Sequence, residues 1–209
     1  QKKYLFSQNQ IKRICNRKFG IGGDGFILLE NSNHTDFEMR YYNANGQQSS
    51  MCGNGGRCVV AFAKKIGLIK TECKFVAYDG VHQAKYLGGD LVLLEMSDVH
   101  VIEKYQDAWK LDTGSPHLVF FKDNISEINV KQHGRDIRNS SEFLEKGINI
   151  NFVEYRDGQL YIRTYERGVE NETLACGTGA IASAIASFES GLIKSSVIVV
   201  NVLGGQLEI

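Results

Sequence analysis

The feature that most constrains the fold is a Cys-Gly-x-Gly motif that occurs twice in the chain. The first copy lies in "MCGNGG" at residues 51–56 and the second in "ACGTGA" at residues 175–180. Each copy is followed by a stretch rich in Ala, Val and Ile that ends at a glycine. The pattern predicts helices over residues 55–67 and 178–191. The second stretch is almost wholly apolar or small, so we expect protein on all sides of it.

Strand-like stretches flank both motifs. They are rich in β-branched and aromatic residues and are bounded by Gly, Asn and Asp. We predict strands at residues 37–42, 74–78, 91–96, 117–121, 149–155, 160–165 and 196–202. An Asp-Gly pair in "YRDGQLYI" predicts a tight hairpin turn. We also expect a helix within residues 7–20 that Gly20 stops, and a bend at Pro116.

Both halves of the chain therefore have the same order of strands, cysteine motif, small-residue helix and further strands. This internal symmetry predicts two similar domains. We expect an α+β fold with two pseudo-symmetric domains, each a curved mixed sheet around a central helix, and an active site in the cleft between them. The boundary falls in "SDVH", which gives an N-terminal domain at residues 1–97 and a C-terminal domain at residues 98–209.

The composition is that of a globular protein without a polyanionic or membrane partner. The 209 residues are 43% hydrophobic and 23% charged, and 24 basic side chains balance 24 acidic ones. With no net charge and no basic stripe, we expect no nucleic-acid partner. No apolar run approaches the ~20 residues of a membrane span. The start, "QKKYLFSQNQ", lacks the apolar stretch of a signal peptide.

The five cysteines are Cys15, Cys52, Cys58, Cys73 and Cys176. An odd number without an export signal is typical of reduced thiols in a cytoplasmic protein. The five residues between Cys52 and Cys58 fit no zinc-binding spacing, and no paired histidine motif accompanies them. We therefore expect no metal.

A cysteine at the amino end of a helix is well placed for chemistry. The helix dipole and the unpaired N–H groups favour thiolate, and the glycines leave those groups uncovered for a carboxylate. One copy alone could equally be a buried, inert cysteine with glycines needed for packing. If both copies face one cleft, Cys52 and Cys176 can flank one α-carbon. One sulfur then removes the α-proton and the other delivers a proton to the opposite face.

Several segments resemble the diaminopimelate epimerase family. "NANGQQSSMCGNGGRC" and "ERGVENETLACGTGA" look like its two signature segments, and "FGIGGDG", "FVAYDGVH", "TGSPH" and "INFVE" resemble further segments in the right order. The resemblance covers essentially the whole chain. It implies an isomerase without a cofactor that interconverts LL- and meso-diaminopimelate on the route to lysine and peptidoglycan. It also implies a cytoplasmic homodimer whose partner is this small-molecule substrate.

The resemblance assigns the site residues in four groups. The acid–base pair falls on Cys52 and Cys176. The backbone cradle for the α-carboxylate falls on Gly53, Asn54, Gly177 and Thr178. The substrate-binding side chains fall on Asn43, Asn149, Glu166 and Arg167. The residues that tune the pKa of a catalytic cysteine fall on His117 and Glu166.

Without the resemblance, Asn43 reads as a turn residue, Arg167 as part of a strand-end ion pair with Glu166, and His117 as a structural histidine. The chain also departs from the family pattern. Ser115 stands where the family usually has Asn, and Gly25 where it has a binding Gln. The loop before the second cysteine is one residue longer, so we expect it to bulge. The family's amino-terminal "GNDF" segment and carboxy-terminal tail are not found, so we expect an incomplete copy.

Three other functions fit parts of the pattern. A proline racemase-like isomerase shares the architecture but has a substrate with no distant carboxylate, whereas Arg167, Asn43 and Asn149 favour one that has it. A thiol redox protein could use the two cysteines as a switch. Such a protein needs no carboxylate cradles, and the usual Cys-x-x-Cys spacing is missing from this chain. Retention of both cysteines speaks against a non-catalytic binding module.

Overall fold

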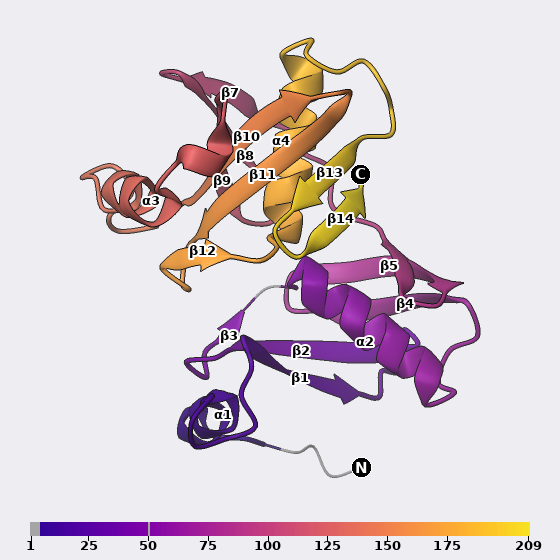
Figure 1. Ribbon diagram of the computed structural model, residues 1–209. Helices are drawn as coiled ribbons and strands as arrows, with labels where there is room; N and C mark the ends of the chain where they lie inside the picture. The colour runs from indigo at the N-terminus through magenta and orange to yellow at the C-terminus, as the bar shows by residue number, and fades with distance from the viewer. Residues whose placement is uncertain (1–4, 50) are drawn as a thin grey trace. The chain divides into compact units, whose positions relative to one another are not determined.

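The computed structural model describes residues 5–49 and 51–209 and divides into two compact units, Gln1–Met96 and Ser97–Ile209 (Figure 1). Each unit combines a mixed sheet with a helix packed across it. The expected α+β class with two pseudo-symmetric domains is confirmed.

The sheet of the first unit has the strand order β1-β2-β4-β5-β6, with β3 beside β2. Strands β2 and β4 are parallel and the other neighbours antiparallel. The strands are β1 (Gly25–Glu30), β2 (Phe37–Asn43), β3 (Gln48–Ser49), β4 (Glu72–Ala77), β5 (Gly80–Gly88) and β6 (Leu91–Leu94). The helices are α1 (Gln8–Cys15) and α2 (Gly53–Lys65).

Helix α2 is held on this sheet by one apolar face. Val60 and Ala63 are fully buried in one cluster with Phe37 and Phe75, whose rings stack with centroids 5.0 Å apart. Burying each phenylalanine contributes about 1.5–3 kcal/mol. A Cβ on Gly56 would lie 2.8 Å from Leu94 Cδ2, so a larger residue at the start of α2 would require the Leu94 side chain to move.

Helix α1 ends earlier than the sequence predicts. Ser7 and Gln10 form a capping box at its start. The expected stop at Gly20 is wrong, because Asn16 already ends the helix. Its side-chain oxygen accepts hydrogen bonds from the N–H groups of Lys18 and Phe19, each at 2.9 Å. Such local side-chain bonds compete with the helical pattern.

The sheet of the second unit has the strand order β14-β13-β11-β10-β9-β8-β7, with β12 beside β11. The pairs β9–β10 and β11–β13 are parallel. The strands are β7 (Ile102–Tyr105), β8 (Ala108–Asp112), β9 (Pro116–Phe121), β10 (Asn149–Arg156), β11 (Gln159–Glu166), β12 (Asn171–Thr173), β13 (Val199–Val202) and β14 (Gly205–Glu208). The helices are η1 (Ile125–Glu127), α3 (Val130–Arg138) and α4 (Gly177–Glu189).

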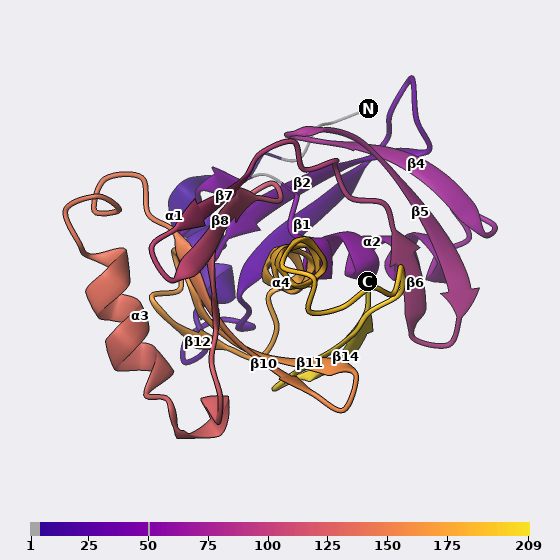
Figure 2. The same ribbon diagram turned by 90° about the horizontal axis from the view of Figure 1, so that it is seen from above.

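Helix α4 lies inside the curve of this sheet, as Figure 2 shows with the helix seen almost end-on. Ala180, Ala182 and Ala186 are fully buried in one cluster with Val119 and Leu160 of the strands. Small side chains let the strands surround the helix closely, which confirms the expectation from the sequence. The opposite face of the sheet packs against α3 through a second cluster.

The two units repeat one topology. In the first unit, the hairpin β1–β2 is followed by β3 antiparallel to β2, then α2, then β4 parallel to β2 and β5 antiparallel to β4. In the second, the hairpin β10–β11 is followed by β12 antiparallel to β11, then α4, then β13 parallel to β11 and β14 antiparallel to β13. The cysteine motif therefore occupies the same place in both repeats.

Local expectations had mixed outcomes. The hairpin turn is confirmed, with Asp157 and Gly158 at φ values of 53° and 79°. The bend expected in "DTGSPH" is present, because residues 113–115 bend between β8 and β9. Pro116 then begins β9 opposite Asp112, and the first residue of a strand tolerates proline. Helix α3 was not predicted. It contains Gly134, and a Cβ there would lie 2.3 Å from Tyr165 Cβ, so close packing requires the glycine.

Candidate functional site

Cys52 precedes α2 as its N-cap residue, with extended backbone at φ −94° and ψ 125°. Its side chain is half-buried, and Gly53, Asn54 and Gly55 form the first turn of the helix. Those first residues carry N–H groups that the helix itself does not use. The first predicted cradle thus lies at the positive end of a helix dipole.

Asp79 and His82 support the residue before Cys52. Asp79 Oδ1 accepts a hydrogen bond from the Met51 N–H at 3.0 Å and lies 3.3 Å from Nε2 of the buried His82. Partial burial opposes ionisation of Asp79, but the bonds from His82 and Met51 hold its pKa below the ordinary value. An ionised carboxylate therefore fixes the main chain that leads into α2.

The other two predicted residues of the first unit, Asn43 and Asn54, make local hydrogen bonds. Asn43 ends β2 in a turn, where its N–H donates to the Gln47 carbonyl at 2.9 Å and its carbonyl accepts from the Gly46 N–H at 2.8 Å. Asn54 Oδ1 accepts from Arg57 Nη2 at 2.6 Å within the first turns of α2.

Cys176 is the N-cap residue of α4 and is buried. Its Sγ lies 3.5 Å from Thr178 Oγ1, which in turn lies 3.0 Å from Nε2 of His117 on β9. The Thr113 hydroxyl donates to the Thr178 carbonyl at 2.9 Å and so holds the first turn of α4 against the β8–β9 connection. The structure thus brings together His117, Thr178 and Cys176.

His117 is neutral at physiological pH. Its side chain is fully buried, and burial lowers its pKa to about 3, with a smaller contribution from the positive charge of Arg167. Its Nδ1 lies 3.0 Å from Asn151 Nδ2 on β10. A neutral imidazole cannot act as an acid here, but it can orient the groups around it.

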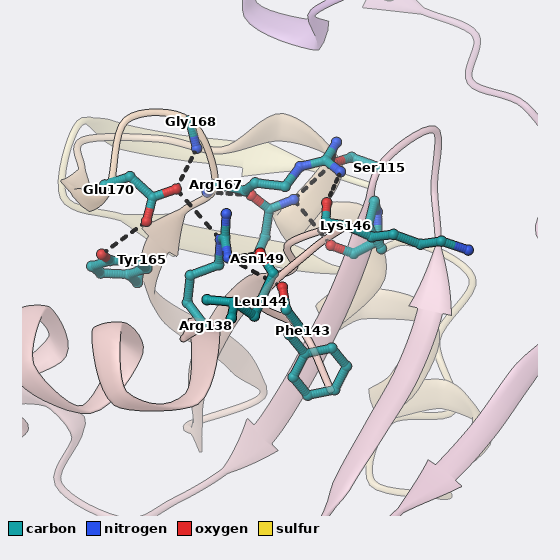
Figure 3. A network of polar contacts seen from close by, with 11 residues as sticks. Ser115, Arg138, Phe143, Leu144, Lys146, Asn149, Tyr165, Arg167, Gly168 and Glu170 are labelled. Carbon is teal, nitrogen blue, oxygen red and sulfur yellow. Dashed lines mark hydrogen bonds and ion pairs between the residues drawn. The ribbon is translucent and has the colours of Figure 1, made fainter. Parts of the chain in front are cut away.

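Asn149, Arg167 and Ser115 form a second cluster in this unit (Figure 3). Asn149 Nδ2 donates to Ser115 Oγ at 2.7 Å, and Asn149 Oδ1 accepts from the Arg167 N–H at 2.8 Å. Arg167 Nη2 donates to the same Ser115 Oγ at 3.3 Å, and Nη1 donates to the Lys146 carbonyl at 3.1 Å. The serine that replaces the family's usual Asn therefore anchors both side chains, while Arg167 remains exposed.

Glu166 ends β11 next to Arg167 and is half-buried. Its Oε2 accepts a hydrogen bond from Thr173 Oγ1 at 2.8 Å, between β11 and β12. This contact fixes the carboxylate at the start of the loop that leads to α4.

The long loop before Cys176 closes as a tight turn around Glu170. This residue has φ 56°, and its N–H donates to the Glu166 carbonyl at 2.8 Å. Its carboxylate accepts from the Gly168 N–H at 3.0 Å and from the Tyr165 hydroxyl at 3.1 Å, and lies 3.4 Å from Arg138 Nε (Figure 3). Hydrogen bonds therefore fix the main chain at Arg167 and on the side of Glu170.

In residues 5–49 and 51–209, no group of three or more His, Cys, Asp or Glu side chains could hold a metal ion. The helices of the same ranges are too short or too polar to cross a lipid bilayer.

Comparison with models of known protein families shows which family the chain belongs to. A model of the family described as diaminopimelate epimerase matches residues 1–101 and 110–209. The chain belongs to the diaminopimelate epimerase family.

Relatives in this family are similar over nearly the whole chain. The diaminopimelate epimerase of Flavobacterium psychrophilum is 52% identical over 200 residues, which are 95% of this chain and 78% of that protein. The diaminopimelate epimerase of Chlorobaculum tepidum is 41% identical over 214 residues, which are 97% of this chain and 82% of that protein.

Solved structures share the fold at low sequence identity. A PhzF-family phenazine biosynthesis protein of Bacillus anthracis superposes with a TM-score of 0.73 at 13% identity, over 97% of this chain and 80% of that one. A hydroxyproline epimerase of Agrobacterium vitis has a TM-score of 0.64 at 15% identity, over 96% of this chain and 75% of that one. These likenesses show the two-domain fold alone.

Sequence reasoning did not single out several residues that support these clusters. They are Asp79, His82, Arg138, Asn151, Thr164 and Glu170. One signal was available for Asn151, since "NINFVE" places asparagines at alternate positions of a strand that is otherwise apolar. Alternate positions share a face, so a second buried asparagine beside Asn149 could have been expected.

Proposed function

We propose that this protein interconverts LL- and meso-diaminopimelate by direct proton transfer at one α-carbon, with Cys52 and Cys176 as the two acid–base groups. The observation that carries the proposal is the repeated topology, which sets a cysteine as the N-cap of a helix packed on the sheet in both units. The names of the relatives, at up to 52% identity, support the same reaction.

The proposed reaction needs one thiolate and one thiol. The thiolate takes the α-proton, so a C–H bond breaks, an S–H bond forms and the electron pair remains on the α-carbon. The thiol on the other face then gives its proton to that carbon and becomes the thiolate. The configuration inverts and the two sulfurs exchange roles. General acid–base groups work best with pKa values near the working pH, which suits cysteine.

The α-carboxylate would bind at the two helix N-termini. Gly53 and Asn54 begin α2, and Gly177 and Thr178 begin α4, so both sets of N–H groups are directed out of a helix end. Such groups together with the helix dipole form an anion site. They would also stabilise the negative charge that develops when the α-proton leaves.

The distal end of the substrate would bind at Arg167, with Asn43 and Glu166 as further contacts. Arg167 is exposed, and its direction is fixed by Ser115, Asn149 and the Lys146 carbonyl. A fixed guanidinium suits a second carboxylate. This favours diaminopimelate over the substrate of a proline racemase-like enzyme, which has no distal carboxylate.

We further propose that the enzyme acts as a homodimer in the cytoplasm and without a cofactor. The five free cysteines support a reducing compartment. The paired thiols perform both proton transfers, so the mechanism requires no pyridoxal phosphate.

The test is to follow LL-diaminopimelate in D₂O by chiral chromatography and mass spectrometry, with purified protein and no added cofactor. The product should carry deuterium at the inverted carbon, and recovered substrate much less in the first turnovers, because each sulfur serves one face. Cys52→Ala and Cys176→Ala should each abolish epimerisation. Cys58→Ala is the matched control, since this exposed thiol of α2 has no role in the mechanism.

Activity that survives the loss of Cys176, or that depends on added pyridoxal phosphate, would show that the two-thiol mechanism is wrong.

A further inference from the structure

Three polar side chains lie in a row on the face of the second sheet that packs on α4. They are His117 on β9, Asn151 on β10 and Thr164 on β11, which are 0%, 0% and 4% exposed. Asn151 pairs directly with Thr164 in the β10–β11 register. Burying polar groups at this density is costly unless each is hydrogen-bonded, so the orientation of each group is fixed by its neighbours.

The orientation of the Asn151 amide follows from one neighbour that can only accept. The Leu118 carbonyl lies 3.0 Å from Nδ2, so the nitrogen of the amide must face it. On the other side, Oδ1 accepts a hydrogen bond from the Thr164 hydroxyl at 2.9 Å. The second proton of Nδ2 is therefore available to His117 Nδ1 at 3.0 Å.

This amide sets the tautomer of the imidazole. Because Asn151 donates to Nδ1, that nitrogen is an acceptor and the proton of the neutral ring lies on Nε2. Nε2 then donates to Thr178 Oγ1 at 3.0 Å. A hydroxyl that accepts this bond keeps its own proton to donate, and Cys176 Sγ lies 3.5 Å away.

The second glycine of the motif allows this arrangement. A Cβ on Gly179 would lie 2.4 Å from Asn151 Oδ1, so with any other residue either the Asn151 amide or the first turn of α4 would have to move. The glycine thus keeps the helix start within reach of the amide, in addition to any part that it has in binding a carboxylate.

We infer that Asn151 is a positioning residue that fixes His117 as the Nε2–H tautomer and, through Thr178, directs a hydroxyl proton at the sulfur of Cys176. The inference deepens the proposed function and rests on it only for the role of Cys176 in catalysis. A hydrogen bond to a charged acceptor is stronger than one to a neutral acceptor, so the thiolate of Cys176 gains more from this donor than the thiol does.

The first test is the tautomer of the wild-type protein. Proton–nitrogen-15 correlation spectra of the histidine-labelled full chain, with His117 assigned from a His117→Phe variant, should show protonated Nε2 and unprotonated Nδ1. A ring protonated on Nδ1 would overturn the inference. This measurement uses no substrate, so its result does not depend on the proposed reaction.

The second test is Asn151→Leu, which removes the amide at nearly constant volume. It should lower kcat by about 10- to 100-fold, in line with loss of one hydrogen bond to a charged group, and change KM little. In a Cys52→Ala background, the ultraviolet absorbance of the Cys176 thiolate should titrate at higher pH once Asn151 is replaced.

The matched control is Asn201→Leu. Asn201 also donates from Nδ2 to a strand carbonyl, that of Leu160 at 3.2 Å, but lies on β13 away from the row. It should leave kcat and the thiolate titration unchanged. A folded Asn151→Leu protein whose Cys176 titrates as in the parent would contradict the inference, whether or not the epimerase activity is found.

Discussion

The N-termini of α2 and α4 carry the same motif but are supported by different chemistry. At Cys52 the support is charged and acts on the main chain, because ionised Asp79 bonds the Met51 N–H. At Cys176 the support is neutral and reaches the sulfur, from His117 through the Thr178 hydroxyl. The repeat thus supplies two helix N-termini that begin at a cysteine, and each unit adds different supporting contacts there.

The two helices also differ in how they are packed. Helix α2 exposes Phe62 and two lysines of its last turn, whereas α4 is buried along nearly its whole length. A helix enclosed by strands cannot shift without breaking many contacts. The relay of contacts from His117 through Thr178 to Cys176 therefore lies in the unit in which the distance from strand to helix is fixed most firmly.

Exchanging sulfur for oxygen at either helix end should have the largest effect. Cys52→Ser and Cys176→Ser should each lower kcat by about 10³-fold or more, because a hydroxyl is a far poorer acid–base group near neutral pH. Initial rates from both stereoisomers measure the loss, with Cys58→Ser as control. Should one serine variant keep near wild-type rates, the two helix ends would not be equivalent partners in the reaction.

Removing the relay should have a smaller effect, confined to the second unit. Thr178→Val removes the hydroxyl between His117 and Cys176 and should lower kcat by about 10- to 100-fold. Thr178→Ser keeps the hydroxyl and should restore most of the rate. Steady-state kinetics of both variants measure the two losses, and equal losses would mean that the hydroxyl does not account for the effect.

Loss of the Asp79 carboxylate in the first unit should have the smallest effect and appear mainly in stability. Asp79→Asn should lower the free energy of unfolding at pH 7 by about 1 kcal/mol, in line with a partly exposed hydrogen-bonded carboxylate. The pKa of Asp79 is depressed in the folded protein, so its contribution is complete above the unfolded pKa, near 3.9, and is lost as the pH falls through the lower folded value.

Urea unfolding of wild type and Asp79→Asn between pH 7 and pH 3 measures this difference, which should shrink below about pH 4. Asp24→Asn is the control, because the Arg17–Asp24 pair has side chains 69% and 86% exposed and should contribute less than about 0.5 kcal/mol. If the difference in free energy of unfolding between wild type and Asp79→Asn grows as the pH falls, Asp79 is not held ionised.

Sequence reasoning predicted the parts of the fold that depend on local pattern. The small-residue composition before Gly191 predicted the buried helix α4, and Asp157-Gly158 predicted the β10–β11 turn. Helix α3 was missed because Gly134 lowers helix propensity, and only its contact with Tyr165 explains the residue. Pro116 in "DTGSPH" predicted the bend that joins β8 to β9, but no local pattern showed that the proline itself begins β9.

The same limit applies to the candidate site. The cysteines and His117 lie in motifs that a sequence can show, although their joint role in catalysis stays a prediction. Asn151 and Thr164 act through their register on neighbouring strands, and Asp79 through a contact with the main chain of a distant loop. Such contacts exist only after the sheet has formed, so no spacing in the sequence encodes them.

The complete burial of His117 has a consequence for the tolerance of the fold to acid. The unfolded chain binds a proton at this ring near pH 6.5, whereas the folded chain accepts it only at about pH 3. Between these values each fall of one pH unit shifts the balance toward the unfolded chain by about 1.4 kcal/mol. Burial of the His117 ring therefore lowers the free energy of unfolding as the pH falls below about 6.5.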